Sequence, residues 1–333
     1  MSNQQLLDYI KERLKQGASK EQIRASLIEN GWPLEEIDKA FSLSLNSSPI
    51  FQSLVPQATT ATLLGVTILF NQAVAICKQK LRIFLGIMII PMLISIVLPA
   101  VLSIAGIFTF ASELSSIGRM SAVTYGGLFF LVVLVSQVWG QTALLYAIKD
   151  SQGEVGVAEA YRRGSKKILP YFWISILSIP IIFGGFSLLV IPGVIFTVWF
   201  SLSIFVMIAE DLNGMNALLK SREYVKGKWG DVAWRLFFVA AVSFLVTWIS
   251  GLILGFLLGK LGTEIVRFAG GLFLTPFVMT YLYLVYGNLK AIKGEIAFSP
   301  TGSQKAVFLA VGAFGILIVY AIFSLLRFFK DLH

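Results

Sequence analysis

Long runs without a charged side chain dominate the chain after its first sixty residues. Six runs contain no Asp, Glu, Lys or Arg: 83–112, 120–148, 168–209, 236–259, 268–289 and 306–326. A membrane-spanning helix needs about 20 consecutive apolar residues, so five of these runs have room for one span each. The run 168–209 holds 42 residues and contains the turn-forming sequence Ile191-Pro192-Gly193, so we expect a hairpin of two spans there. The pattern predicts seven membrane-spanning helices.

The first 43 residues have a different pattern, in which apolar residues recur every three or four positions. They predict three short helices, the first ended by Gly17 and the second by Gly31. Because about forty residues are marginal for independent stability, we expect Trp32 to supply much of the core of this bundle. The predicted order is a cytoplasmic three-helix module (1–43), a flexible linker (44–60), a six-span membrane domain with interfacial helices (61–296) and an additional C-terminal span (297–333).

The segment 61–77 allows two interpretations, a span or a helix in the plane of the membrane. Asn71 and Gln72 lie in its middle and its apolar core is short, which favours an interfacial helix. Three predicted cytoplasmic segments, which begin near residues 71, 158 and 216, share one plan: a mildly apolar helix, a basic cluster and then a span. The simplest account is three copies of an in-plane amphipathic helix followed by a transmembrane hairpin. The alternative is that basic cytoplasmic loops occur in any polytopic protein.

The composition agrees with a membrane protein. Hydrophobic residues make up 56% of the chain and charged residues 14%, against about 45–50% and 25% in ordinary soluble domains. A net charge of +9 could suit nucleic acid, but residues 1–40 carry six basic and seven acidic side chains. The positive excess therefore lies between the hydrophobic runs, where anionic lipid headgroups are the natural counter-charge. We expect the bilayer, and no nucleic acid, as the partner of these charges.

Lysine and arginine are distributed unevenly between the two sides of the predicted spans. With residues 1–43 in the cytoplasm, 22 of the 27 basic residues are cytoplasmic and five are outside, as the positive-inside rule requires. We therefore expect a cytoplasmic N-terminus and an external C-terminus. Basic residues beside the predicted in-plane helices are the candidates for binding anionic lipid headgroups: Lys78, Lys80, Arg82, Arg162, Arg163, Lys166, Lys167, Lys220, Lys226 and Lys228.

Few polar side chains fall inside or at the ends of the predicted spans. Gln137 and Gln141, one turn apart in the second span, either line a passage or form hydrogen bonds between helices. Glu210 lies where the fourth span meets the cytoplasm. It is expected either to pair with Arg222 or a neighbouring lysine, or to remain an interfacial carboxylate in water.

Small residues recur on one face of the fifth span. Gly251, Gly255 and Gly259 are spaced four positions apart, a pattern that lets helices approach closely. The close contact is expected either within the chain or between two copies of it, which leaves a homo-oligomer open.

The sequence offers no residue set suited to common enzyme mechanisms. His333 is its only histidine and Cys77 its only cysteine, so we expect no Ser/His/Asp or Cys/His nucleophilic set and no zinc site. The nucleotide-binding patterns GxxxxGK[ST] and GxGxxG do not occur. We expect no enzyme activity, no metal and no cofactor, although mechanisms that use carboxylates alone remain open.

Residues 60–296 resemble the membrane domain of glycerophosphoryl diester phosphodiesterases and related stand-alone bacterial multi-pass proteins. The resemblance rests on these residues: Gly153-Glu154 through Ala158, Ile191-Pro192-Gly193, Trp199, Ser201, Glu210, Gly214, Ala217-Leu218, Ser221, Val225-Lys226-Gly227 and Trp229. It implies a bacterial inner membrane protein. In that family a separate soluble barrel is catalytic, and no soluble segment here is long enough for a barrel of about 250 residues. The N-terminal residues resemble a ubiquitin-associated-like module through Gly31-Trp32.

These features favour a non-catalytic membrane protein that anchors or scaffolds, with residues 1–43 binding a cytoplasmic protein partner. The alternative is a transporter or lipid-handling protein with a cavity between its helical hairpins. A cavity that reaches the middle of the membrane near Gln137 would favour the alternative, whereas a packed interior would favour the scaffold.

Overall fold

The computed structural model describes residues 26–27, 62–104, 116–150, 155–294, 296, 298 and 300–331. Within these ranges the chain forms helices and no strand, and seven helical segments are long and apolar enough to cross a membrane. The predicted all-α, polytopic membrane fold is therefore confirmed. The candidate spans are Leu81–Val101, Gly126–Lys149, Ile168–Leu188, Val190–Glu210, Trp229–Leu258, Lys260–Lys293 and Gly302–Ile322.

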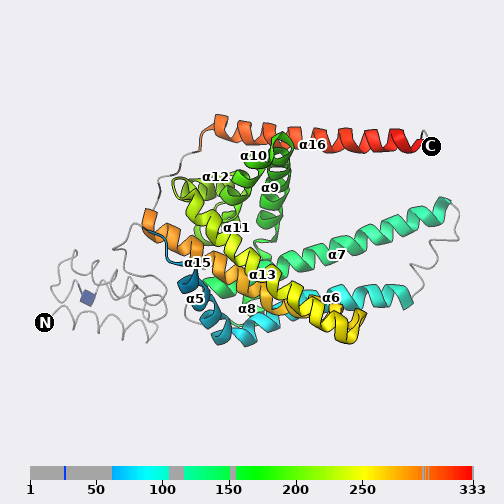
Figure 1. Ribbon diagram of the computed structural model, residues 1–333, viewed down its shortest axis with the longest axis horizontal. Helices are drawn as coiled ribbons and strands as arrows, with labels where there is room; N and C mark the ends of the chain where they lie inside the picture. Colours follow the sequence, from blue (N-terminus) through cyan, green and yellow to red (C-terminus); the bar gives the residue numbers. More distant parts are fainter. Residues whose placement is uncertain are drawn as a thin grey trace. The chain divides into compact units, whose positions relative to one another are not determined.

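The described helices follow a threefold order of one short helix and then two spans (Figure 1). The first set is α5 (Val66–Gln79), α6 (Leu81–Ile104) and α7 (Ser116–Lys149). The second is α8 (Val157–Ser165), α9 (Ile168–Leu188), α10 (Val190–Phe200) and α11 (Ser203–Glu210). The third is α12 (Gly214–Val225), α13 (Trp229–Leu258), α14 (Lys260–Ala269), the π-helical turn η1 (Gly270–Leu274) and α15 (Thr275–Lys293), and α16 (Gly302–Asp331) follows. This order agrees with the predicted repeat of a short helix and a hairpin.

The hairpin within 168–209 turns slightly earlier than predicted. Leu189 has extended backbone angles (φ −167°, ψ 155°) between α9 and α10, whereas Ile191-Pro192-Gly193 lies in the first turn of α10. Proline is tolerated there because the first backbone N–H groups of a helix have no partner within the helix. The proline therefore begins the second helix of the hairpin and does not form its turn.

The helix α5 is too short to cross a bilayer by itself. Its 14 residues extend about 21 Å at 1.5 Å per residue, less than the hydrocarbon thickness of about 30 Å. The chain just before α5 is fixed by two residues of the third set. Asn288 Oδ1 accepts a hydrogen bond from Leu64 N at 3.0 Å, and the buried Arg235 donates to the carbonyl oxygens of Leu63 and Leu64.

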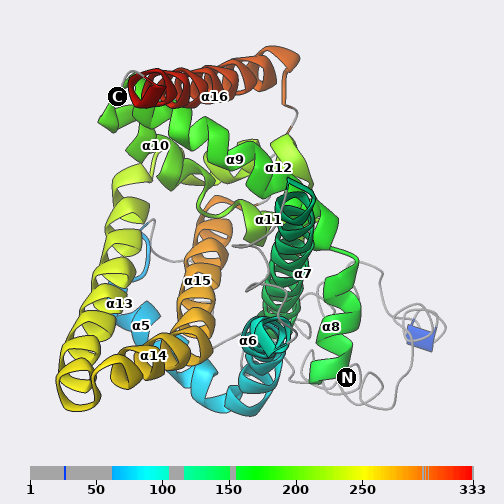
Figure 2. The same ribbon diagram turned by 90° about the vertical axis from the view of Figure 1, so that its right-hand side faces the viewer.

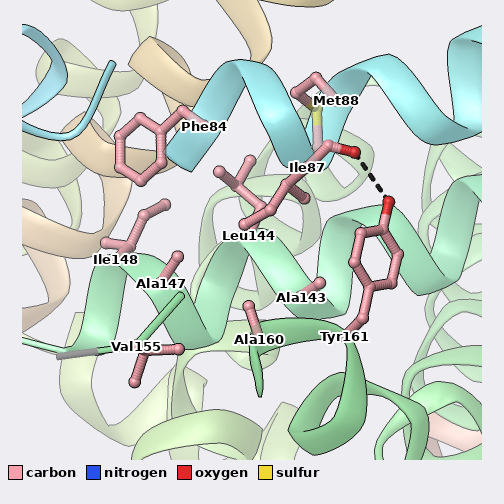
Figure 3. Close-up of a cluster of buried hydrophobic side chains, with 10 residues drawn as sticks. All are labelled: Phe84, Ile87, Met88, Ala143, Leu144, Ala147, Ile148, Val155, Ala160 and Tyr161. Atoms are coloured by element: carbon pink, nitrogen blue, oxygen red, sulfur yellow. Dashed lines mark hydrogen bonds between the residues drawn. The ribbon is translucent and has the colours of Figure 1, made fainter. Parts of the chain in front are cut away.

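The helix α8 buries its apolar face against α6 and α7 (Figure 3). Tyr161 Oη donates a hydrogen bond to the carbonyl oxygen of Ile87 at 2.7 Å, and Trp139 Nε1 donates to the carbonyl oxygen of Tyr161 at 2.9 Å. Burial raises the pKa of Tyr161 to about 12. A Cβ atom at Gly164 would lie 2.8 Å from the backbone nitrogen of Ala143, so only glycine allows α8 and α7 to approach this closely.

The chain divides into two compact units, Met1–Thr59 and Thr60–His333. In the first unit the structure describes Ser26 and Leu27, which are helical, and Leu27 is buried. Leu27 belongs to the apolar face of the second predicted helix. The remainder of the predicted module, including its predicted core residue Trp32, and the predicted linker 44–60 lie outside the described residues.

Candidate functional site

A cavity of about 890 Å³ lies between α6, α7, α14 and η1. Figure 2 shows α14 connecting the ends of α13 and α15. Most of the wall is apolar, with Met88, Met92, Ile96, Ile265, Phe268 and Phe273 among its residues. The polar lining residues are Ser95, Gln137, Gln141 and Thr275, and the charged ones are Glu264 and Arg267. Ligand sites are typically apolar cavities of about 300–1,000 Å³ with a few polar groups, and this cavity has that character.

Gln137 lies about halfway along its span. It is 12 residues before Lys149, the last residue of α7, a rise of about 18 Å. Its Nε2 donates a hydrogen bond to Ser95 Oγ at 3.1 Å, and Ser95 Oγ donates to the carbonyl oxygen of Pro91 at 2.8 Å. The Gln137 side chain is nonetheless exposed. An exposed amide at this depth is costly in hydrocarbon unless it faces water or a polar ligand.

Gln141 lines the same cavity and also links two hairpins. Its Oε1 accepts a hydrogen bond from the hydroxyl of Tyr171 on α9. The two alternatives for the glutamines are thus both present, because each side chain lines the cavity and each forms a hydrogen bond to another helix.

The helix α14 places opposite charges at the cavity. Glu264 Oε2 lies 3.1 Å from Arg267 Nη1, and both side chains line the cavity. Neither residue was among the site residues predicted from the sequence. The signal was present, since Leu261, Ile265 and Phe268 recur at helical spacing between the charged positions.

Within the described part of the chain, Gly251, Gly255 and Gly259 do not make the close helix contact, so their predicted contact between two copies stays a prediction. Gly251 and Gly259 have no atom within 4 Å of the place where a Cβ would lie, and a Cβ at Gly255 would only touch Thr263 at 3.4 Å. Gly259 has φ +59° and ends α13. The close contact within the chain is made by Gly262, whose Cβ would lie 1.9 Å from the carbonyl oxygen of Leu254. Gly262 therefore allows α14 to pack directly against the backbone of α13.

The segment α14–η1 borders further cavities. A cavity of about 410 Å³ lies between it and α13, and one of about 220 Å³ lies between η1 and α5–α6. The turn η1 itself is π-helical. Single π-helical turns within α-helices occur frequently at functional sites.

A second polar region is centred on Glu210, whose carboxylate is largely buried among partners from the same chain. The Glu210 carboxylate accepts hydrogen bonds from Tyr224 Oη at 2.5 Å and Tyr286 Oη at 2.8 Å. Lys290 Nζ lies 3.2 Å and Lys220 Nζ 3.8 Å from its oxygens, and only 14% of the Glu210 side chain is exposed. Glu210 thus pairs with neighbouring lysines and is not an interfacial carboxylate in water.

Arg222, the other predicted partner of Glu210, has a different role. Its guanidinium carbon lies 4.8 Å from the ring centre of Trp199 and 5.6 Å from that of Phe308. Such distances allow cation–π attraction, so Arg222 connects α12 to α10 and α16.

Two of the headgroup candidates, Lys80 and Lys220, are buried, so this prediction is corrected for them. Lys80 Nζ donates to the carbonyl oxygen of Ala147 at 2.8 Å and pairs with Asp150, and Lys220 Nζ donates to the carbonyl oxygen of Ile296 at 2.5 Å. Burial lowers the pKa of Lys80, while Asp150 opposes this shift. Lys80 and Lys220 thus bind carbonyl and carboxylate oxygens of the chain itself, and not the lipid phosphates that the sequence predicted as their partners.

The other headgroup candidates remain predictions. Lys78, Arg82, Arg162, Arg163, Lys166 and Lys226 are exposed, Lys228 is half-buried, and only 14% of the Lys167 side chain is exposed. Lys167 pairs with Asp211, and the Lys167 ammonium lowers the pKa of that carboxyl group. Lys167–Asp211 and Lys80–Asp150 hold equivalent places in the first two sets of helices. In each, a lysine just before the first span meets an aspartate just after the second.

Within the described ranges, no three His, Cys, Asp or Glu side chains come together in a way that could hold a metal ion. Comparison of the chain with protein-family models, with curated proteins and with solved structures found no match. The resemblance to the membrane domain of the phosphodiesterases therefore stays a prediction.

Proposed function

We propose that this chain is a membrane protein that binds a lipid in the cavity between α6, α7 and α14. The observation that carries the proposal is the combination of an apolar wall with the exposed amide of Gln137 midway along its span. A packed interior at this place would have favoured the scaffold. The cavity favours the lipid-handling alternative.

The lining of the cavity suits an amphiphilic ligand better than a small polar solute. Side chains such as Met92, Phe268 and Phe273 offer a surface for an acyl chain. The amides of Gln137 and Gln141 suit the ester or hydroxyl groups that join acyl chains to a headgroup. By contrast, α13 presents an apolar surface to its surroundings, with Phe256 92% exposed, as ordinary contact with lipid tails requires.

The distribution of basic residues supports an orientation of the cavity in the membrane. With a cytoplasmic N-terminus in the inner membrane of a bacterial cell, α14 lies on the outer side, so the cavity extends from that side towards the middle of the bilayer. In a Cys77→Ser background, an impermeant thiol reagent should label Lys260→Cys from outside but not Lys226→Cys. Labelling of Lys226→Cys alone would reverse this orientation.

Photolabelling with a lipid tests the proposal directly. The full-length protein in membranes is irradiated with a phospholipid that carries a diazirine in its acyl chain, and labelled peptides are identified by mass spectrometry. We expect label in peptides that contain Met92 and Phe268. Met92→Trp fills the cavity and should reduce this label several-fold. Ile90→Trp is the matched control, because Ile90 is exposed on the same helix and does not line the cavity.

The distribution of label decides between a site and ordinary lipid contact. Label confined to exposed residues of α13, or equal effects of the two tryptophan variants, would show that lipids only surround the protein. The proposal would then be wrong.

A second function, recruitment of a cytoplasmic protein by residues 1–43, is supported by the division of the chain at Thr59–Thr60. Proteins that co-purify with the full chain and are lost when residues 1–45 are removed would identify the partner. Identical co-purification with both forms would remove this second candidate.

A further inference from the structure

The cavity presents one cation and one anion side by side. Glu264 and Arg267 are three positions apart on α14, and their charged groups are 3.1 Å apart. All the other described residues that line the cavity are uncharged. A ligand in this cavity therefore meets a pair of charges that sum to zero.

This pair is free to exchange partners with a ligand. About 79% of the Arg267 side chain and 59% of the Glu264 side chain are exposed, and exposed ion pairs add little to stability because water competes for both partners. The close contact of Gly262 with α13 holds the helix that carries the pair. The backbone positions of both residues are thus fixed, while the bond between their side chains is weak.

The chemistry of the two side chains selects the kind of headgroup. The planar guanidinium of Arg267 can donate two parallel hydrogen bonds to phosphate oxygens. The carboxylate of Glu264 can accept hydrogen bonds from an ammonium group. A headgroup with both groups satisfies both residues, whereas a purely anionic headgroup would be repelled by Glu264.

On the basis of the proposed function, we infer that the lipid in the cavity carries a zwitterionic headgroup of the phosphoethanolamine kind. Arg267 binds its phosphate and Glu264 binds its ammonium group. The acyl chain lies along the apolar wall formed by residues such as Met92 and Phe273.

Competition between lipids of different headgroup tests this assignment. The full-length protein is labelled with the diazirine phospholipid in the presence of unlabelled phosphatidylethanolamine, phosphatidylglycerol or diacylglycerol with identical acyl chains. Phosphatidylethanolamine should suppress the label at the lowest concentration. Arg267→Gln should raise the required concentration at least about tenfold, because it removes the charge-assisted hydrogen bonds to the phosphate. Glu264→Gln should reduce the preference for phosphatidylethanolamine over phosphatidylglycerol, measured as the ratio of the two suppressing concentrations, by a similar factor.

Lys260→Gln is the matched control, because Lys260 is an exposed residue of the same helix and does not line the cavity. It should leave the order of competition unchanged. Equal competition by the three lipids, or an equal effect of Lys260→Gln and Arg267→Gln, would overturn the headgroup assignment while the cavity remained a lipid site. Absence of label from the cavity would remove the proposed function itself.

Discussion

The Glu210 region and the cavity beside Gln137 handle polar groups in opposite ways. Glu210 is enclosed, and two tyrosine hydroxyls and two lysines surround its carboxylate. Gln137 has one hydrogen bond to Ser95 and is exposed to a cavity of about 890 Å³. A polar group enclosed by partners within the chain stabilises the fold, because leaving the partners unmatched would be costly. A polar group that faces an open cavity has capacity left for a ligand.

The largest expected effect on stability comes from removing the Glu210 carboxylate. Glu210→Ala leaves Lys220 and Lys290 without their carboxylate, and removing one partner of a buried pair costs about 3–5 kcal/mol. We expect a large drop in the thermal unfolding temperature of the protein in detergent. Asp211→Asn is the matched control, because 82% of the Asp211 side chain is exposed and asparagine tolerates the positive φ of 58° at this position, so the loss of this charge should cost less than about 1 kcal/mol. Equal losses in the two variants would show that Glu210 is not enclosed as described.

Substitution by a larger side chain should lower the unfolding temperature in a packed region and not at the cavity. Ala143 is a fully buried residue of α7 that packs against α8, so Ala143→Leu should cost about 1–3 kcal/mol through overpacking. Met92→Trp adds a similar volume but has the cavity to occupy, so its unfolding temperature should stay close to that of the unchanged chain. A large loss from Met92→Trp would indicate that the cavity is closed in solution.

The two glutamines give a finer test within one helix. Gln141→Leu removes the acceptor of the Tyr171 hydroxyl and should cost about 1 kcal/mol. Gln137→Leu should leave the unfolding temperature nearly unchanged and should reduce photolabelling by the diazirine lipid. The reverse pattern would assign Gln137 to structure and Gln141 to the ligand.

The sequence was informative wherever the controlling interaction is local. A span must avoid charge over about 20 residues, so the uncharged runs, together with the turn sequence within 168–209, predicted seven spans, and the candidate spans of the structure agree. The sixth candidate span, Lys260–Lys293, contains the uncharged run 268–289 and begins earlier, because Lys260, Glu264 and Arg267 excluded 260–267 from the run. Helix α14 nonetheless continues through η1 into α15.

The candidate site could not be predicted in full because it depends on contacts between distant segments. Gln137 was recognised as polar within a span, but the cavity also needs α14, more than a hundred residues later. For the same reason the sequence pattern could not predict which lysine side chains are buried in the folded chain. Lys80 and Lys220 are buried because Asp150 and Glu210 lie opposite them in the folded chain, and nothing within the basic clusters distinguishes them from exposed neighbours.

The smallest expected effect concerns the exposed charges of α8, which contrast with the enclosed ones. Hydrogen bonds from Arg162 and Arg163 lower the pKa of Glu159 from 4.5 to about 2. Because the folded pKa lies below the unfolded value, this carboxylate stabilises α8 at all pH values above 4.5, and its contribution disappears as the pH falls from 4.5 towards 2. Hydrogen exchange across 157–165 should therefore accelerate slightly in that window.

Glu159→Gln isolates this titration from general acid effects. The variant should exchange faster than the unchanged chain at neutral pH and lose the specific change between pH 4.5 and 2, because glutamine does not titrate. Exchange across 81–88 of α6 provides the reference, since that segment contains no acidic residue. If the unchanged chain and the variant respond to acid identically across 157–165, Glu159 does not stabilise α8 through its two arginines. The short helix would then be held by its buried face against α6 and α7 alone.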